Sequence, residues 1–276
     1  MVVNADSAQL YRDLPVLSAA PDAADQSQAE HRLYGAIDGA GSCSAADWAR
    51  LARGEIARVH EQGRLPILVG GTGLYIRSLL DGIAPVPPIE EGVRERVRAR
   101  PVEANRAELA DLDPAAADRL NPADTTRIAR ALEVVLSTGK PIDAWQQERA
   151  GGIGDRVSLS PLILLPPRDW LYRLCDERFS AMLNAGAIPE VEALLARNLD
   201  PALPVMRAIG VREIAAMLRG EMTREQVIAA GAQATRNYAK RQYTWFANQP
   251  PPDWPRFRDA LGAETLESAL SHLGSR

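Results

Sequence analysis

The fold is decided by Arg64-Leu65-Pro66-Ile67-Leu68-Val69-Gly70-Gly71-Thr72-Gly73-Leu74-Tyr75, a stretch in the first third of the chain. Its apolar run, Ile67 to Val69, ends at two glycines, and a helical pattern follows from Leu74. This pattern predicts a buried parallel strand that leads into a helix at its carboxyl end. Ligands bind at that edge of open α/β sheets, because backbone N–H groups and helix N-termini converge there. The Thr72 hydroxyl suits such a site, although a tight turn with a threonine cap explains the same residues.

Length and composition are those of a globular protein. The chain has 276 residues, 46% hydrophobic and 25% charged, so it can bury a large core as one domain with an insertion or as two domains. No apolar run is long enough to span a bilayer, and no signal pattern opens the chain, so we expect no membrane association. Cys43 and Cys175 lack ligand spacing, which argues against disulfides and zinc sites and favours a reducing cytoplasm.

The charged residues are unevenly distributed by type. The net charge of −4 argues against a globally basic nucleic-acid-binding protein. All of the 32 basic residues are arginines except Lys140 and Lys240. Arginine suits bidentate phosphate contacts, so its local clusters carry more information than its total, which a genome rich in G and C would also produce.

The remaining patterns alternate strands with helices. Apolar runs predict strands at residues 1–5 and 157–165, and residues 10–32 are expected to be irregular. The clearest helical patterns lie at 45–60, which opens with a capping box at Ser44, and at 170–185, 189–198 and 223–247; another helix opens near Arg207. A proline-rich linker at 84–88 precedes a charge-dense helical segment. We therefore predict an α/β sheet with an inserted helical part.

Three polar clusters are candidate sites. Residues 4–9 set a carboxylate, a hydroxyl and an amide side by side after the first strand, as a polar site or a helix cap. Asp124 can cap a helix with Arg127 and Arg130 on one face and a buried stripe that includes Ile128. On the last long helix one face is polar, which favours phosphate binding or solvation; it carries Gln233, Arg236, Lys240 and Tyr243.

Five motifs, in the same order, resemble the tRNA dimethylallyltransferases (isopentenyltransferases). They are Asn4-Ala5-Asp6-Ser7-x-Gln9-x-Tyr11, Leu68-Val69-Gly70-Gly71-Thr72-Gly73-Leu74-Tyr75, Asp124-x-x-Arg127-x-x-Arg130-Ala131-Leu132-Glu133-Val134, Arg207-x-x-Gly210-x-Arg212-Glu213 and Lys240-Arg241-Gln242-x-Thr244-Trp245. The resemblance covers nearly the whole chain. It implies a nucleotide-binding, P-loop-NTPase-like parallel sheet flanked by helices. The catalytic core would comprise residues 1–86 and 125–249, with a helical insertion at 87–124 that contacts tRNA and a C-terminal tail at 250–276.

The resemblance also implies a reaction. A dimethylallyl group passes from dimethylallyl diphosphate to the exocyclic amine (N6) of the adenosine adjacent to the tRNA anticodon, with Mg²⁺ as cofactor. Asp6 would accept a hydrogen bond and then a proton from that amine, and Thr72 would orient the adenine. Arg178 would neutralise the diphosphate. We expect a cytoplasmic monomer.

Two sets of binding residues follow from the resemblance and the polar stripe. The diphosphate would contact Arg178, Arg236, Lys240 and Arg241. The tRNA anticodon stem-loop would contact Asp6, Ser7, Ala8, Gln9, Thr72, Arg94, Thr126, Arg127, Ile128, Ala129, Arg130, Ala208, Ile209, Gly210, Val211, Arg212 and Glu213. The target base must leave its stack to reach a buried site, so part of these contacts would hold a distorted loop.

The chain departs from the family pattern at three points. Ala8 stands where the family has a larger residue, often methionine, and Leu174 stands where the family has an arginine. The family's first strand and its phosphate loop, Gly-x-x-x-x-Gly-Lys-[Ser/Thr], are missing from this sequence, which we expect to begin at the second family strand. Three interpretations stay open: a transferase given with a misplaced start or as a truncated piece, an inactive tRNA-binding remnant, and a transferase acting on free adenine nucleotides. Arg94, Arg127 and Arg130 favour RNA.

Overall fold

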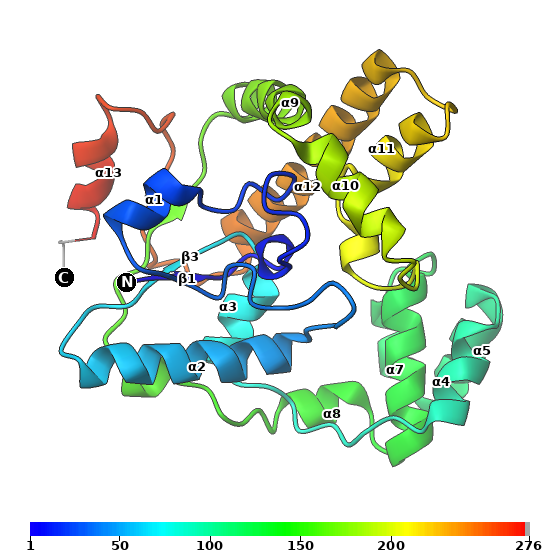
Figure 1. The fold of residues 1–276 in the computed structure, drawn as a ribbon. Coiled ribbons are helices and arrows are strands. Elements are labelled where there is room, and N and C mark those ends of the chain that lie inside the picture. The colour runs from blue at the N-terminus through cyan, green and yellow to red at the C-terminus, as the bar shows by residue number, and fades with distance from the viewer. Residues whose placement is uncertain (274–276) are drawn as a thin grey trace. The chain divides into compact units, whose positions relative to one another are not determined.

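The computed structural model describes residues 1–273, which form two compact units. The first, which we call the α/β unit, comprises Met1–Ser78 and residues 156–273. The second, the helical unit, is Leu79–Asp155. Figure 1 traces the chain through both. The helical unit is thus an insertion into the α/β unit, as the sequence predicts, but its boundaries differ from the predicted ones.

The strands of the α/β unit form two small parallel sheets. In the first, the strand order is β2-β1-β3, with β1 at Val2–Asn4, β2 at His31–Arg32 and β3 at Ile67–Val69. Val2 is aligned with His31 on one side and with Ile67 on the other. The second sheet pairs β4 (Ile163–Leu164) with β5 (Arg256–Phe257). The predicted α/β class with a parallel sheet is confirmed.

Several local predictions for these strands are wrong. Within residues 1–273 β3 pairs only with β1, so it is an edge strand and not a buried one, and Ile67 and Val69 are each 50% exposed. The region 10–32 contains β2 and a helix, α1 (Ala23–Gln28), which Asp22 caps. The strand expected at 157–165 shrinks to two residues, because Pro161 and Pro166 flank it and cannot donate to a ladder. The predicted tail contributes β5 to the second sheet.

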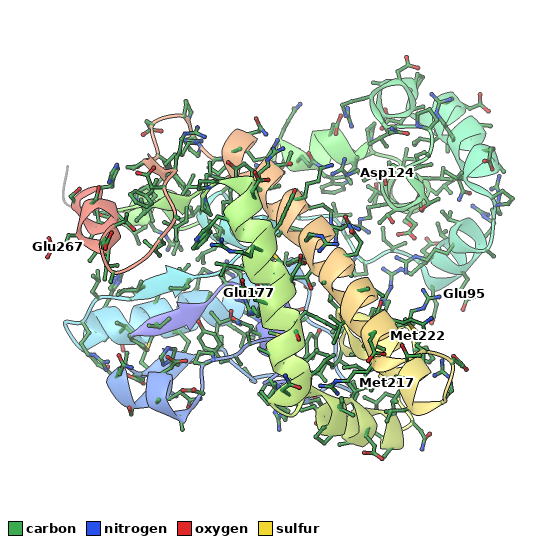
Figure 2. The ribbon with its side chains drawn as sticks, turned by 90° about the horizontal axis from the view of Figure 1, so that it is seen from above. Glu95, Asp124, Glu177, Met217, Met222 and Glu267 are labelled. Carbon is green, nitrogen blue, oxygen red and sulfur yellow. The ribbon has the colours of Figure 1, made fainter. Side chains whose placement is uncertain are left out.

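Capping boxes start two long helices of the α/β unit, one of them α12 (Arg224–Asn248). Ser44 and Asp47 form the predicted capping box of α2 (Ala45–Glu61), and Thr223 forms one with Gln226 at α12. Helices α9 (Arg168–Asn184) and α12 lie side by side (Figure 2), which Gly231 permits because a Cβ there would overlap the Phe179 ring. The other helices are α3 (Gly73–Leu80, which ends in the helical unit), α10 (Ala187–Ala196), α11 (Val211–Leu218) and α13 (Leu266–Ser271).

The helical unit has its own apolar core. Its helices are α4 (Glu91–Arg98), α5 (Val102–Leu112), α6 (Pro114–Arg119), α7 (Thr125–Thr138) and α8 (Ile142–Gln146). Asp124, labelled in Figure 2, caps the start of α7, and Gly139 ends it at φ 67°. Ile128 and Leu132 pack against Val97 and Leu109, so α7 is part of this compact unit, whereas the predicted insertion ends at residue 124. Across residues 1–273 no helix is both long and apolar enough to cross a membrane.

Candidate active site

A cavity of about 650 Å³ opens in the α/β unit where β1 and β3 end. Asp6 and Ser7 line it from the loop after β1, and Gly70 lines it from the loop after β3. Arg178 on α9, Arg241 on α12 and Arg207 contribute the positive charges of its wall. This is the carboxyl edge of the parallel strands, where the sequence pattern predicts ligand binding.

The loop after β1 is built on the buried side chain of Asn4. Its Oδ1 accepts the N–H of Asp6 at 2.7 Å, and its Nδ2 donates to the carbonyls of Asp6 and Leu33 at 2.9 and 3.0 Å. The indole of Trp48 donates to the Asn4 carbonyl at 2.9 Å. Because both polar atoms of the Asn4 side chain and its carbonyl are hydrogen-bonded, the backbone that carries Asp6 is fixed.

Asp6 is a partly buried carboxylate. Burial raises the pKa of Asp6, while the N–H of Ala8 and the charge of Arg178 lower it. The Ala8 N–H donates to Oδ1 at 2.8 Å. A carboxylate with a raised pKa is a better proton acceptor than an exposed one, which is the property that a general base requires.

The glycine loop after β3 brings Thr72 to the same place. A Cβ at Gly70 would overlap the carbonyl of Ala5, so only glycine fits there. The N–H of Thr72 donates to the Ala5 carbonyl at 3.1 Å. Its Oγ1 accepts the N–H of Ser7 at 2.9 Å and donates to the Ser7 hydroxyl at 3.2 Å. The structure thus places Thr72 in contact with Ser7, which lies 65 positions away along the chain and next to Asp6.

Helix α12 holds this loop from the other side. Gln242 donates its side-chain N–H to the carbonyl of Gly71 at 3.0 Å, and Trp245 packs against Gly73. Burial and the nearby Asp6 carboxylate raise the pKa of Tyr238, whereas its hydrogen bonds with Thr72 and other neighbours lower it. Neither Tyr238 nor Gln242 was among the predicted site residues. Their spacing of four on one helix, which puts them on one face, is the signal that could have found them.

The predicted diphosphate residues separate into two pairs. Arg178 and Arg241 line the cavity, and the Arg241 guanidinium lies 5.5 Å from the centre of the Tyr238 ring. Arg236 instead forms an ion pair with Asp176, and Lys240 is exposed outside the cavity lining. The sequence pattern put Arg236 and Lys240 on one polar face correctly, but that face does not line the cavity.

The segments expected to contact tRNA differ in exposure. In the α/β unit Ala208 and Ile209 line the cavity and Arg212 is exposed, whereas Val211 is only 2% exposed. In the helical unit Arg94, Thr126 and Arg127 are exposed, and Ile128 is fully buried. Side-chain contacts with RNA from Ile128 and Val211 are therefore excluded in this conformation, because both side chains belong to apolar cores. The remaining members of the set are Gln9, Ala8, Ala129, Arg130, Gly210 and Glu213, of which Gly210 is buried at the start of α11.

The fold and the cavity define an α/β protein with a ligand site at the carboxyl edge of its parallel strands. The model of the IPP transferase family matches residues 9–249. The tRNA dimethylallyltransferase of Novosphingobium aromaticivorans is 64% identical, over 98% of this chain and 97% of that protein. That of Erythrobacter litoralis is 63% identical, over 93% of this chain and 81% of that protein.

A solved structure agrees with these sequence matches. The full-length tRNA isopentenylpyrophosphate transferase of Bacillus halodurans is similar with a TM-score of 0.67 and 31% identity, over 98% of this chain and 85% of that one. The chain therefore belongs to the IPP transferase family. The family resemblance inferred from the five motifs is confirmed.

Proposed function

We propose that this chain is a tRNA dimethylallyltransferase. It transfers a dimethylallyl group from dimethylallyl diphosphate to N6 of the adenosine adjacent to the anticodon. The observation that carries this proposal is a carboxylate of raised pKa, Asp6, on the cavity wall beside Ser7, whose N–H and hydroxyl contact the Thr72 hydroxyl. The names of the two relatives, which cover nearly all of this chain, support the substrate assignment.

The residues of the cavity divide the work of the reaction. An aromatic exocyclic amine is a poor nucleophile, so Asp6 accepts its hydrogen bond and then its proton. The N6–C1 bond forms while the bond between C1 and the diphosphate oxygen breaks, and the diphosphate leaves with the bonding electrons. Arg178 and Arg241 stabilise the charge that develops on the leaving group. Phe179 and Met182, on the apolar part of the wall, exclude water from the dimethylallyl carbons.

We include Mg²⁺ in the proposal. Mg²⁺ prefers oxygen ligands and is commonly held by one or two protein oxygens together with substrate phosphates. Ser7 presents its hydroxyl oxygen on the cavity wall, and the Thr72 hydroxyl lies 3.2 Å behind it, so the residues present offer oxygen ligands that fit this ion. When bound, Mg²⁺ would neutralise negative charge on the diphosphate.

We also propose that diphosphate binding uses a phosphate loop, a motif that these 276 residues do not contain. The edge position of β3 supports this proposal. Within residues 1–273 β3 has β1 as its sole strand partner, and Leu65, Ile67 and Val69 are at least half exposed. A further parallel strand at this edge would cover those side chains, and the loop after it would supply N–H groups to the diphosphate.

The test is transfer of labelled dimethylallyl groups to unmodified tRNA, with free AMP as an alternative acceptor and with product identification by mass spectrometry. We expect label on tRNA and none on AMP. We also expect much more transfer by a chain extended upstream in frame than by the 276 residues alone. Transfer to AMP in preference to tRNA would instead identify an adenine-nucleotide transferase. Binding of tRNA without transfer by either length would identify an inactive remnant. Equal transfer by both lengths would overturn the phosphate-loop proposal alone.

A further inference from the structure

A buried carboxylate lies beneath a group of arginines in the helical unit. Glu133, on α7, is 1% exposed. Its Oε1 accepts the Nε–H of Arg98, on α4, at 2.8 Å. Its Oε2 has no hydrogen-bond partner among the described residues and lies 3.9 Å from a terminal nitrogen of Arg130. One buried carboxylate therefore faces two guanidinium groups that come from two different helices.

The charges around Glu133 do not cancel. Burial lowers the pKa of Arg130, Glu133 raises it, and Arg94 and Arg98 lower it further. The guanidinium groups of Arg98 and Arg130 thus share one carboxylate, and Arg94 is near enough to repel Arg130, which leaves a local excess of positive charge. Like charges held this close repel one another, and an anion that binds among them relieves that repulsion.

The contact with Glu133 restricts the Arg98 side chain but engages only one of its N–H donors. The Arg98 side chain is 64% exposed, so its guanidinium meets solvent although its Nε is held. Glu133 contacts the Nε–H, and the donors on the two terminal nitrogens are not engaged by that bond. A long flexible side chain held in this way loses less freedom when it binds a phosphate, so each contact that it makes is stronger.

A purely structural role explains Glu133 less well. Burial of a carboxylate costs several kcal/mol, and well-packed apolar residues often stabilise such a position as much or more. All residues from Ala131 to Val135 except Glu133 are apolar and buried, so an apolar side chain would fit the same stretch of α7. A role in positioning the neighbouring arginines explains why a carboxylate occupies this position.

We propose that Arg98 is a phosphate-binding residue for the RNA backbone and that Glu133 is the positioning residue that presents it. Neither belongs to the tRNA-binding set that the family resemblance implies. The choice of tRNA as the RNA rests on the proposed function, but the recognition itself concerns phosphate groups and needs no dimethylallyl transfer.

The variant Glu133→Gln tests the proposal through the sign of its effect. Removal of a negative charge by itself strengthens binding to a polyanion, whereas loss of a positioned arginine weakens it. We expect the affinity for unmodified tRNA to fall several-fold, and the slope of log K against log salt concentration to decrease by about one phosphate contact. The matched control is Glu108→Gln, which removes the same charge from another carboxylate–arginine pair of this unit, Glu108 with Arg100. The control should bind tRNA as tightly as the unchanged chain or more tightly.

A double-mutant cycle with Arg98→Ala separates positioning from support of the fold. If Glu133 acts through Arg98, Glu133→Gln has little further effect on tRNA affinity in the Arg98→Ala background. If the carboxylate only supports the helical unit, both backgrounds lose affinity, and thermal unfolding shows the same loss of stability in each. Unchanged or tighter binding by Glu133→Gln overturns the proposal. The proposed function fails separately, if the unchanged chain binds tRNA with a normal salt dependence but does not modify it.

Discussion

The two units hold a carboxylate in opposite ways. In the α/β unit Asp6 is partly buried beside a cavity, accepts one backbone N–H and has a raised pKa. In the helical unit Glu133 is fully buried and is bound by Arg98, with Arg130 nearby. Burial without a bound cation keeps a carboxylate basic, whereas burial against arginines turns it into a support for those arginines. In the functions proposed above, the proton acceptor Asp6 and the phosphate-binding Arg98 belong to different units.

The largest effect that would test this comparison is expected at Asp6. Asp6→Asn keeps the shape of the side chain but cannot accept a proton from the amine. We expect the rate of dimethylallyl transfer to fall by ~10²–10⁴-fold in a chain that carries a phosphate loop, with little change in tRNA affinity. Single-turnover rates and filter binding measure the two quantities. Near-normal turnover would remove Asp6 from the role of base.

The same variant has an expected effect on stability, which serves as its control. Burial raises the pKa of Asp6 in the folded state. A raised carboxyl pKa stabilises the fold below the unfolded-state value, and this contribution is lost as the pH rises through the folded-state value. At pH 7 the ionised Asp6 therefore opposes folding, and Asp6→Asn should melt at the same temperature as the unchanged chain or higher. A lower melting temperature would mean that the lost activity reflects unfolding.

The next effect tests how rigidly Asp6 is held. In Gly70→Ala the new Cβ would overlap the Ala5 carbonyl and lie 2.6 Å from the N of Asp6, so backbone must shift. We expect a loss of ~1–3 kcal/mol in unfolding free energy and a large loss of transfer. Gly71→Ala should be milder, because its Cβ would meet only the side-chain end of Gln242. Gly54→Ala, with no atom within 4 Å of its Cβ, should stabilise helix α2 by ~0.5–1 kcal/mol. Equal stabilities, measured by urea unfolding, would contradict this ranking.

What the sequence predicted was mostly local. The limits of β3, the capping box at Ser44 and the Asp124 and Gly139 ends of α7 depend on residues within a few positions of each other. The edge position of β3 was not predicted, because strand order depends on pairings between distant segments. At Ile128 the two lines of sequence evidence disagreed: periodicity predicted a buried residue and the family resemblance a tRNA contact. The structure agrees with periodicity.

The site was predicted to the extent that it lies at strand ends. Asp6 and Thr72 follow parallel strands, whose carboxyl ends meet at one edge, so their proximity could be inferred from the chain. The contribution of α12 could not, because Gln242 reaches Gly71 across 171 positions and no local rule sets that contact. The pairing of Arg98 with Glu133 was missed for the same reason, since it joins α4 to α7.

A moderate effect is expected from the arginines of α7. Arg127 is 76% exposed and its only ion pair within residues 1–273 is a 3.6 Å contact with Asp124, whereas Arg130 is 43% exposed and lies near Glu133. We expect Arg127→Ala and Arg130→Ala each to weaken tRNA binding and to lower the salt slope by about one. Arg130→Ala should have the larger effect, because its guanidinium is less free before RNA binds. Salt titrations check this, and unchanged binding in both variants would identify a merely solvated face.

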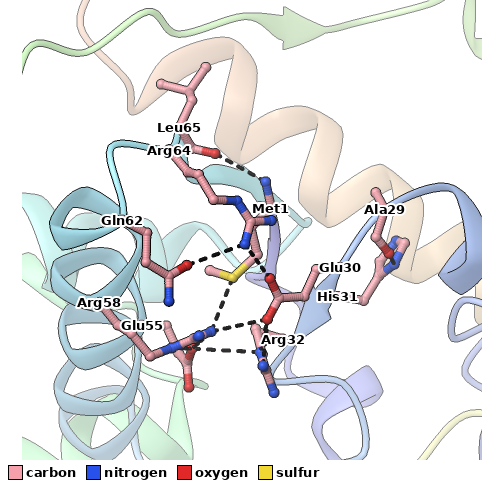
Figure 3. A network of polar contacts seen from close by, with 10 residues as sticks. All are labelled: Met1, Ala29, Glu30, His31, Arg32, Glu55, Arg58, Gln62, Arg64 and Leu65. Carbon is pink, nitrogen blue, oxygen red and sulfur yellow. Dashed lines mark hydrogen bonds and ion pairs between the residues drawn. The ribbon is translucent and has the colours of Figure 1, made fainter.

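The smallest effect is expected at Glu30, a carboxylate that is paired without being buried. Figure 3 shows it among Arg32, Arg58 and Arg64, with Glu55 alongside. The hydrogen bonds of these arginines, that of Arg64 first, lower the pKa of Glu30 from 4.5 to about 2. Glu30, like Glu133, is paired with arginines, but its side chain is 27% exposed, so solvent screens the attraction.

The sign of its pH dependence follows from that lowered pKa. A lowered carboxyl pKa stabilises the fold above the unfolded-state value, near 4.5, and this contribution is lost as the pH falls to about 2. Glu30→Gln should therefore melt slightly below the unchanged chain at pH 7, and the gap should close between pH 4.5 and pH 2 and shrink in 1 M salt. Glu61→Gln, at a residue of α2 that has no ion pair within residues 1–273, should leave no such gap. A gap at Glu30 that persists at pH 2 would mean that its contribution comes from packing or hydrogen bonding and not from its charge, and the contrast with Glu133 would then rest on burial alone.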